Sequence, residues 1–245
     1  MFRFNRIPRF FGLFFFLFCL SVAATAASFF ETLELSFEKT LGEDTYQKII
    51  AEKKVVQLPA EEAERLNSIF GRIASASSRK AELSFSLTVV EDETVNAFAL
   101  PAGYIFVHTG LLAFTQSDDE IAGVLAHEVA HVDRKHSMKA IKRQLGMSLL
   151  LRLIMNPEDS PETLRKIGAL AVNLAQLGYS REEEFEADRY GVYFMEKAGY
   201  QRKELINFWE RMREASGGEN NPAFLYLFST HPPTTERIER IRNLP

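Results

Sequence analysis

The chain has 245 residues, which suits one ordinary domain or one domain with a helical extension. Its hydrophobic fraction of 46% is ample for a buried core and excludes a disordered chain. The formal net charge is -4, and no Lys/Arg stripe is interleaved with aromatic residues. We therefore expect no nucleic-acid partner. The single cysteine, Cys19, lies in the N-terminal segment, so the rest of the chain has no disulfide, thiolate metal ligand or cysteine nucleophile.

Residues 1–27 differ from all that follows. Three arginines precede an almost purely apolar run over residues 10–20, and an A-x-A sequence closes the segment at residues 24–26. This order is typical of a secretory signal peptide. The alternative is an uncleaved N-terminal anchor, because the apolar stretch is nearly long enough to span a bilayer. Both interpretations predict an exported protein, periplasmic or attached to the membrane through its N-terminus and facing the periplasm.

Residues 28–82 are expected to form an N-terminal helical arm. Residues 31–56 have mixed helical character, and a clearer helix follows Pro59 over residues 60–77, with apolar side chains at helical spacing. From residue 83 the pattern changes to alternation, which predicts a strand up to residue 89. Two more short strands are expected at residues 96–100 and 104–108, joined by a Pro-Ala-Gly turn.

After residue 110 the pattern is almost wholly helical. Residues 117–120 (SDDE) form a capping-box sequence, in which Ser117 would cap the helix and Glu120 would return the bond. A second box, SREE at residues 180–183, opens a helix that Gly199 can end. Further helices are expected at residues 203–215 and after Pro233. We interpret residues 83–245 as one domain.

The chemistry is concentrated in the sequence HEVAH at residues 127–131, an HExxH motif. Four residues of an α-helix advance about 400° and roughly 6 Å, so His127 and His131 project from one face. Two neutral imidazoles so placed can bind one zinc ion. Glu128 lies one step round the helix, where it can accept a proton from the hydrolytic water and pass it to the leaving amine.

The helix around this motif is apolar nearly all round, which predicts burial. Two histidines and a glutamate inside a buried helix need polar partners, and a metal ion supplies them. The alternative without a metal is a helix that carries these three residues on its solvent-exposed surface. The sequence favours one zinc ion per chain.

A catalytic zinc ion needs a third protein ligand and an open position. Cysteine is excluded and the HExxHxxGxxH extension is absent, so a carboxylate on another helix is the remaining common solution. In the acidic segment 180–188, Glu184 and Asp188 share a helix face, with Ala187 permitting close approach. One could bind the metal and the other orient a histidine. Such clusters also line solvated helix faces, so spacing alone leaves this assignment open.

The chain resembles a known family in the spacing of these motifs. HExxH followed about fifty residues later by SRxxEFxAD is similar to the gluzincin zinc metallopeptidases that include the HtpX-type and CAAX prenyl proteases. Three further segments carry the resemblance, which runs from about residue 83 to the C-terminus: TVNAFALPAG at 94–103, YIFVHTGLL at 104–112, and STHPP at 229–233, with Arg237 following. Carried over by position, Glu184 becomes the third zinc ligand and Asp188 its outer companion.

The resemblance implies a fold and an activity. We expect an α+β, mostly helical zincin-like domain with a small β-sheet beside the active-site helix, and hydrolysis of peptide bonds. The transmembrane helices of the membrane-embedded members have no counterpart here, so the chain is most similar to the compact periplasmic members. Polypeptides, specifically unfolded or misassembled envelope proteins, are the implied substrates, and protein quality control is the implied role.

Three further histidines lie outside the HExxH motif. His231 precedes Pro232 in the His-Pro segment, so it is either a fourth ligand or oxyanion partner, or part of a simple turn into the last helix. His136, five residues after His131, falls on a different helix face and is expected to be structural or an outer contact. His108 lies in an expected strand, and we assign it no catalytic role.

The strand with Asn96, Ala97 and Phe98 is expected to bind substrate. In an edge strand, free N–H and C=O groups pair with an extended peptide and recognise its backbone rather than its side chains. That mode suits the degradation of unfolded proteins. An alternative of another class is a chaperone-like binding module whose zinc site is latent, blocked by His231.

Overall fold

The structure is a computed structural model that describes residues 9–146, 179–215, 230–232 and 234–245, with side chains from residue 28 onward. The chain divides into two units, Met1–Phe37 and Glu38–Pro245. Helix α1 (Arg9–Glu52) begins in the first unit and ends in the second. Among the described residues, no helix is both long and apolar enough to cross a membrane. The expected divisions after residues 27 and 82 remain predictions.

Helix α2 (Ala60–Ala74) forms where helical spacing predicted it, and its apolar positions are buried. The turn after it is fastened by Arg79, which is 4% exposed and donates to both carboxylate oxygens of Glu38, at 2.9 and 2.7 Å. Arg79 also donates to the carbonyl of Val132 near the end of the motif-bearing helix, at 3.0 Å. This buried ion pair ties residues 38 and 79 to the helix that carries the HExxH motif.

All three expected strands are confirmed. They are β1 (Ser86–Val90), β2 (Ala97–Ala99) and β3 (Tyr104–His108), in the order β1-β3-β2. β1 is parallel to β3, whereas β2 is antiparallel to β3 in a register that pairs Phe98 with Phe106. The expected turn between β2 and β3 is a 3₁₀ turn, Pro101–Gly103, with positive φ at Ala102 and Gly103. Among the described strands, β2 is an edge strand.

The motif-bearing helix is α4 (Asp118–Asp133), and every residue from 120 to 133 is buried. Ser117 caps it as expected, accepting the Glu120 N–H at 3.2 Å. The reciprocal bond of the expected capping box was predicted wrongly. The Glu120 carboxylate instead accepts the N–H of Gln116 at 2.6 Å and the guanidinium of Arg211 at 2.5 and 2.6 Å. The ion pair draws the carboxylate away from the Ser117 amide.

After the sheet, the regular elements of the described residues are all helices. The other helices are α3 (Thr109–Phe114), α5 (His136–Leu145), α8 (Arg181–Lys197), α9 (Arg202–Ala215) and α11 (Thr235–Arg242). The second capping box is confirmed at the start of α8, where Ser180 and Glu183 exchange both bonds. Gly199, with φ 86°, follows the end of that helix as expected.

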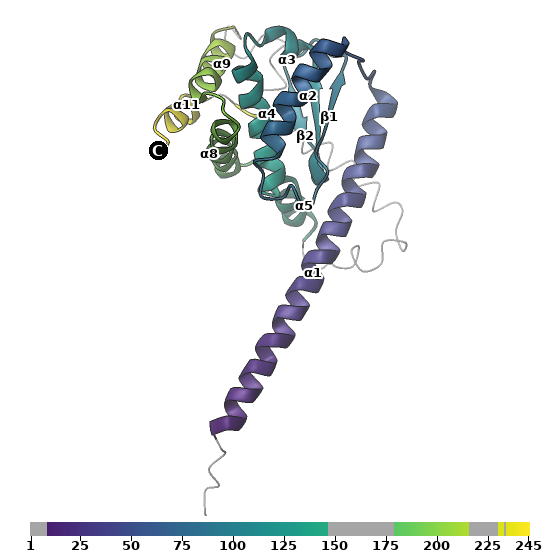
Figure 1. Ribbon diagram of the computed structural model, residues 1–245, viewed down its shortest axis with the longest axis vertical. Helices are drawn as coiled ribbons and strands as arrows, with labels where there is room; N and C mark the ends of the chain where they lie inside the picture. Colours follow the sequence, from purple (N-terminus) through teal and green to yellow (C-terminus); the bar gives the residue numbers. More distant parts are fainter. Residues whose placement is uncertain (1–8, 147–178, 216–229, 233) are drawn as a thin grey trace, which may run out of the picture. The chain divides into compact units, whose positions relative to one another are not determined.

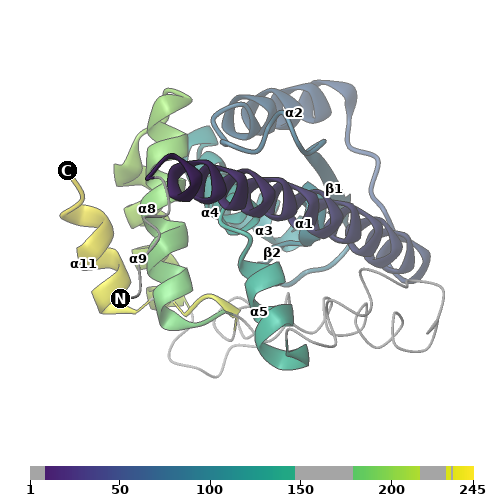
Figure 2. The same cartoon turned by 90° about the horizontal axis from the view of Figure 1, so that it is seen from below.

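Helix α4 lies at the centre of the second unit (Figure 1). Strand β2 and helix α2 contact it on one side, and α8 and α9 on the other. Figure 2 shows α8 from below, with α11 on its outer side. At Gly191 of α8 a Cβ atom would be only 3.1 Å from the Cα and N atoms of His127, so the two backbones approach closely there. The expected fold class, α+β and mostly helical with a small sheet, is confirmed.

Candidate metal centre

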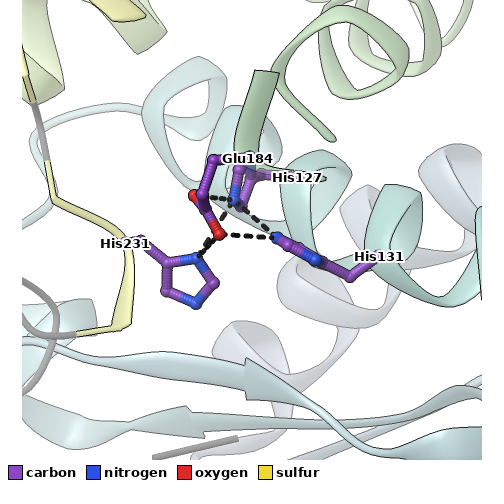
Figure 3. A group of neighbouring side chains, drawn as sticks. All are labelled: His127, His131, Glu184 and His231. Carbon is purple, nitrogen blue, oxygen red and sulfur yellow. Dashed lines mark hydrogen bonds and ion pairs between the residues drawn. The ribbon is translucent and has the colours of Figure 1, made fainter. Parts of the chain in front are cut away.

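Four side chains from three parts of the chain meet at one buried point (Figure 3). His127 and His131 come from α4, Glu184 from the first turn of α8, and His231 from the segment before α11. Each offers one ligand atom, and these atoms lie within 4.8 Å of one another. None of the four residues is more than 2% exposed. The i, i+4 spacing on α4 brings the two imidazoles together, and the close contact of α4 with α8 adds the carboxylate.

The separations of these atoms fit a tetrahedral metal site. The Nε2 atoms of His127 and His131 are 3.0 Å apart, and each is 3.4 Å from an oxygen of Glu184. Ligands at about 2.0–2.1 Å from a tetrahedral zinc ion are about 3.3–3.4 Å from one another. Two histidines and a carboxylate are also a donor set that zinc uses in hydrolases. The residues present therefore fit a zinc ion.

The electrostatics of the cluster also favour a cation. Burial would lower the pKa of His127, but hydrogen bonds to Asp188 and Glu184 raise it to about 9. Burial would raise the pKa of Glu184, yet the charges of His231 and Arg237 hold it well below its usual range. Two ionised carboxylates thus surround His127 and attract positive charge. A divalent ion can supply that charge in place of a proton on the imidazole.

Glu128 lies beside this cluster and is 1% exposed. Its Oε2 has no hydrogen-bond partner among the described residues, and its Oε1 is 3.6 Å from Nε2 of His231. Burial raises the pKa of Glu128, although the charges of His231 and His127, and then a backbone hydrogen bond from Ala99 of β2, oppose that shift. A buried carboxylate with one oxygen unpaired is costly to a fold, so its retention here points to a chemical use.

Asp188 is held where it can orient a metal-binding histidine. Its Oδ1 is 3.1 Å from Nδ1 of His127, the nitrogen that faces away from the cluster. Arg237 of α11 donates to both Asp188 oxygens at 2.7 and 2.6 Å, and its Nη1 is 2.9 Å from Oε2 of Glu184. Burial would raise the pKa of Asp188, but the Arg237 guanidinium lowers it. No role was expected for Arg237, whose only signal in the sequence is its place just after the His-Pro segment.

The structure brings His231 into the cluster. Its Nδ1 is 3.0 Å from Oε1 of Glu184 and 3.3 Å from Nε2 of His127. The same segment also leads into α11, whose N-terminus is capped by Thr234. The ring is near enough to serve as a fourth ligand, and the role of His231 stays a prediction.

The expected substrate strand lies beside the cluster, since the amide of Ala99 at its end reaches Glu128. Asn96, Ala97 and Phe98 are all buried, and the Phe98 ring stacks on Phe106 with centroids 5.1 Å apart. The Oδ1 atom of Asn96 has no hydrogen-bond partner among the described residues.

Two further residues contact the outer face of His131. His136 Nδ1 is 2.9 Å from His131 Nδ1, and the Tyr179 ring stacks on the His131 ring with centroids 4.1 Å apart at 23°. The sequence placed His136 on another helix face, which would hold for a continuous helix. However, α4 ends before Lys135, whose φ of 57° reverses the chain locally. Tyr179 was not singled out, and no motif pointed to it.

Comparison with known proteins agrees with this geometry. Residues 60–244 match the sequence model of peptidase family M48. The chain is 33% identical over 218 residues to mitochondrial metalloendopeptidase OMA1 of Schizosaccharomyces pombe, a match that covers 86% of this chain and 62% of that protein. It is similar to the β-barrel assembly-enhancing proteases of Yersinia pestis (26% identical over 222 residues) and Escherichia coli K12 (24% over 223), covering 86% of this chain and 44% of each. The chain thus spans about half the length of these relatives.

Proposed function

This chain belongs to peptidase family M48, and from that premise we propose that it is an exported zinc-dependent endopeptidase that hydrolyses peptide bonds of unfolded or misassembled envelope proteins. The observation that carries the proposal is the buried group of His127, His131 and Glu184 with Glu128 directly beside it. No other arrangement in the described chain unites a fitting metal donor set with an adjacent buried carboxylate.

In this proposal His127, His131 and Glu184 hold one zinc ion. When bound, zinc supplies Lewis-acid polarisation of a peptide carbonyl and makes water more acidic. Asp188, whose Oδ1 is 3.1 Å from Nδ1 of His127, would accept the proton of that nitrogen and so leave Nε2 free to bind. Arg237 keeps that carboxylate ionised and in place, because it binds both of its oxygens.

Glu128 is the proposed general base and acid. It would take a proton from the attacking water and give it to the amine that leaves. Its burial raises its pKa, which suits a group that must both accept and release a proton near neutral pH. Its unpaired Oε2 is the atom available for that proton.

Strand β2 is the proposed contact for the substrate backbone. It is the edge strand of the described sheet, and its end touches Glu128 through the Ala99 amide. An extended peptide added alongside Asn96, Ala97 and Phe98 would lie next to the metal ligands. The unpaired Oδ1 of Asn96 is a further acceptor for a substrate N–H.

The substrate class and location rest on two observations. The relatives in Yersinia pestis and Escherichia coli are named for enhancing β-barrel assembly. Residues 1–27 have the order of a secretory leader or an N-terminal anchor. We therefore place the protein in the periplasm or on a membrane that faces it, acting in envelope protein quality control.

The test uses the purified full chain loaded with zinc and unfolded casein as substrate. We expect cleavage by the wild type, and for Glu128→Gln a loss of at least about 10²–10⁴-fold in kcat/KM with zinc still bound, because only the proton transfer is removed. Glu184→Ala should lose zinc, whereas Glu182→Ala, an exposed change on the same helix, should keep both zinc and activity.

Two results would contradict the proposal. Zinc binding by the wild type without cleavage by it or by the His231→Ala variant would exclude the peptidase. Full zinc affinity in Glu184→Ala would remove Glu184 from the ligand set. If Glu184→Ala loses zinc while Glu182→Ala keeps it, the loss does not come from general damage to α8.

A second candidate function has a specific observation in its favour. His231 contacts Glu184 through one nitrogen, at 3.0 Å, and faces Glu128 with the other, at 3.6 Å. A ring held there occupies the space beside the general base, as expected for a chaperone-like binding module with a latent zinc site. No casein cleavage by the wild type, together with cleavage by His231→Ala, would favour this alternative.

A further inference from the structure

The two candidate ligand histidines are supported differently on their outer sides. His127 meets a carboxylate directly, with its Nδ1 3.1 Å from Asp188. His131 has no carboxylate at its Nδ1; that atom is 2.9 Å from Nδ1 of His136. The other nitrogen of His136, Nε2, is 3.1 Å from Oε2 of Glu186. A chain of three side chains therefore leads from the candidate metal site to a carboxylate on α8.

The pattern of protons along this chain follows from the chemistry of imidazole. Two ring nitrogens in contact form a hydrogen bond only if one carries a proton and the other does not. A His131 that binds a metal through Nε2 must carry its proton on Nδ1, and it then donates to Nδ1 of His136. His136 consequently carries its own proton on Nε2, which faces Glu186. Each link thus has one donor and one acceptor.

The backbone is built so that these residues can meet. Five residues of a continuous helix would turn His136 away from His131. The left-handed residue Lys135, with φ 57°, separates α4 from α5 and returns the chain, so that His136 is fully buried against His131. Glu186 lies on α8 and is held in place by Arg134, whose Nε donates to Oε1 of Glu186 at 2.7 Å.

We propose that His136 and Glu186 are positioning residues that fix the ring orientation and the proton position of His131 for metal binding. This inference rests on the proposed function, because it assigns His131 to the metal. Metal-binding histidines generally donate their second N–H to a carboxylate, a carbonyl or water, and losing that partner weakens metal binding. Here α8 supplies both outer carboxylates, Asp188 for His127 and Glu186 for His131 through the relay of His136.

A purely structural role for His136 makes a different prediction. A buried histidine that only fills space would change the free energy of unfolding and leave metal affinity unchanged. The chain offers a matched control in His108, which is also buried and lies 3.5 Å from Asp92. Asp92 and Glu186 side chains are equally exposed, at 24%.

The experiment measures the affinity of the purified full chain for Co²⁺ by competition with a chromophoric chelator, together with the visible spectrum of bound Co²⁺. Unfolding is followed separately in excess chelator. We expect His136→Phe and Glu186→Gln to weaken Co²⁺ binding by about 10–100-fold and to alter the spectrum. His136→Gln, whose amide oxygen can still accept from His131, should recover part of the affinity. The Co²⁺ affinities of His108→Phe and Asp92→Asn should stay within about twofold of the wild-type value, even if these changes lower the free energy of unfolding.

Affinity within twofold of the wild type in both His136→Phe and Glu186→Gln would overturn the inference. Glu186→Gln is the milder change because its side chain is partly exposed. If His136→Phe fails to fold, the Co²⁺ affinity of Glu186→Gln alone tests the positioning role. His127→Ala separates this failure from that of the proposed function. If His127→Ala loses Co²⁺ while the two variants keep it, only the positioning role is wrong; if His127→Ala also binds normally, the metal site and both proposals fail.

Discussion

The contact between α4 and α8 at Gly191 gives a quantitative test of how the site is assembled. A Cβ at this position would be 3.1 Å from both the Cα and N atoms of His127. Carbon atoms in ordinary contact are about 3.5–4.0 Å apart, so the two helices must separate by a few tenths of an ångström to admit it. The atoms in the way belong to backbone and cannot turn aside as a flexible side chain could.

The change in the free energy of unfolding caused by Gly191→Ala is the sum of two opposed effects. Alanine in a helix interior is favoured over glycine by about 1 kcal/mol. Forcing an extra methyl group into a packed interior costs about 1–3 kcal/mol. We expect a net loss of about 1 kcal/mol in the free energy of unfolding. Gly71 of α2 is the control, since no atom lies within 4 Å of its Cβ position, and Gly71→Ala should stabilise by about 0.5–1 kcal/mol.

The assay is urea unfolding followed by circular dichroism in excess chelator, so that metal binding does not contribute to the measured free energy. The Zn²⁺ affinity of each variant is then measured separately. It should fall only for Gly191→Ala, because that change moves Glu184 relative to His127. If Gly191→Ala stabilises the protein as much as Gly71→Ala does, α4 and α8 are not in close contact at Gly191.

Three further predictions concern charges and caps, all measured as free energies of unfolding in excess chelator. Arg237→Met leaves the buried Asp188 carboxylate without its guanidinium partner and should cost about 3–5 kcal/mol. Much of that loss should be recovered in the double variant that also carries Asp188→Leu. A loss below about 1 kcal/mol in Arg237→Met would contradict the buried ion pair. Burial holds the pKa of His108 at about 4, so as the pH falls from about 6.5 to 4 the unfolded chain binds a proton that the folded chain does not. The wild type should therefore lose about 2–3 kcal/mol more over that interval than His108→Gln, and parallel pH profiles would refute this. Ser180→Ala removes the cap of α8 and should cost about 1 kcal/mol, with no change if the helix begins elsewhere.

The local elements of the described chain were predictable because their signals are local. Alternation over a few residues predicted β1, and the second capping box predicted the start of α8. The first box shows the limit of such reasoning. Ser117 caps α4 as its sequence requires, but the Glu120 side chain is taken by Arg211, ninety-one residues away. The carboxylate is shared between this distant guanidinium and the N–H of Gln116, and nothing near Glu120 in the sequence indicates the ion pair.

The placement of the two candidate ligands on α4 follows from the order of residues alone. The rise and rotation of a helix follow from the backbone alone, so HExxH places His127 and His131 on one face in any fold that keeps the helix. The tertiary structure decided what faces them. His231 reaches His127 across 104 residues, Arg237 reaches Asp188 across 49, and His136 turns back to His131 only because the helix breaks at Lys135. These side-chain contacts depend on how α4, α8 and α11 pack. Helix packing is set by the shapes of whole helix surfaces rather than by the spacing of residues within one helix.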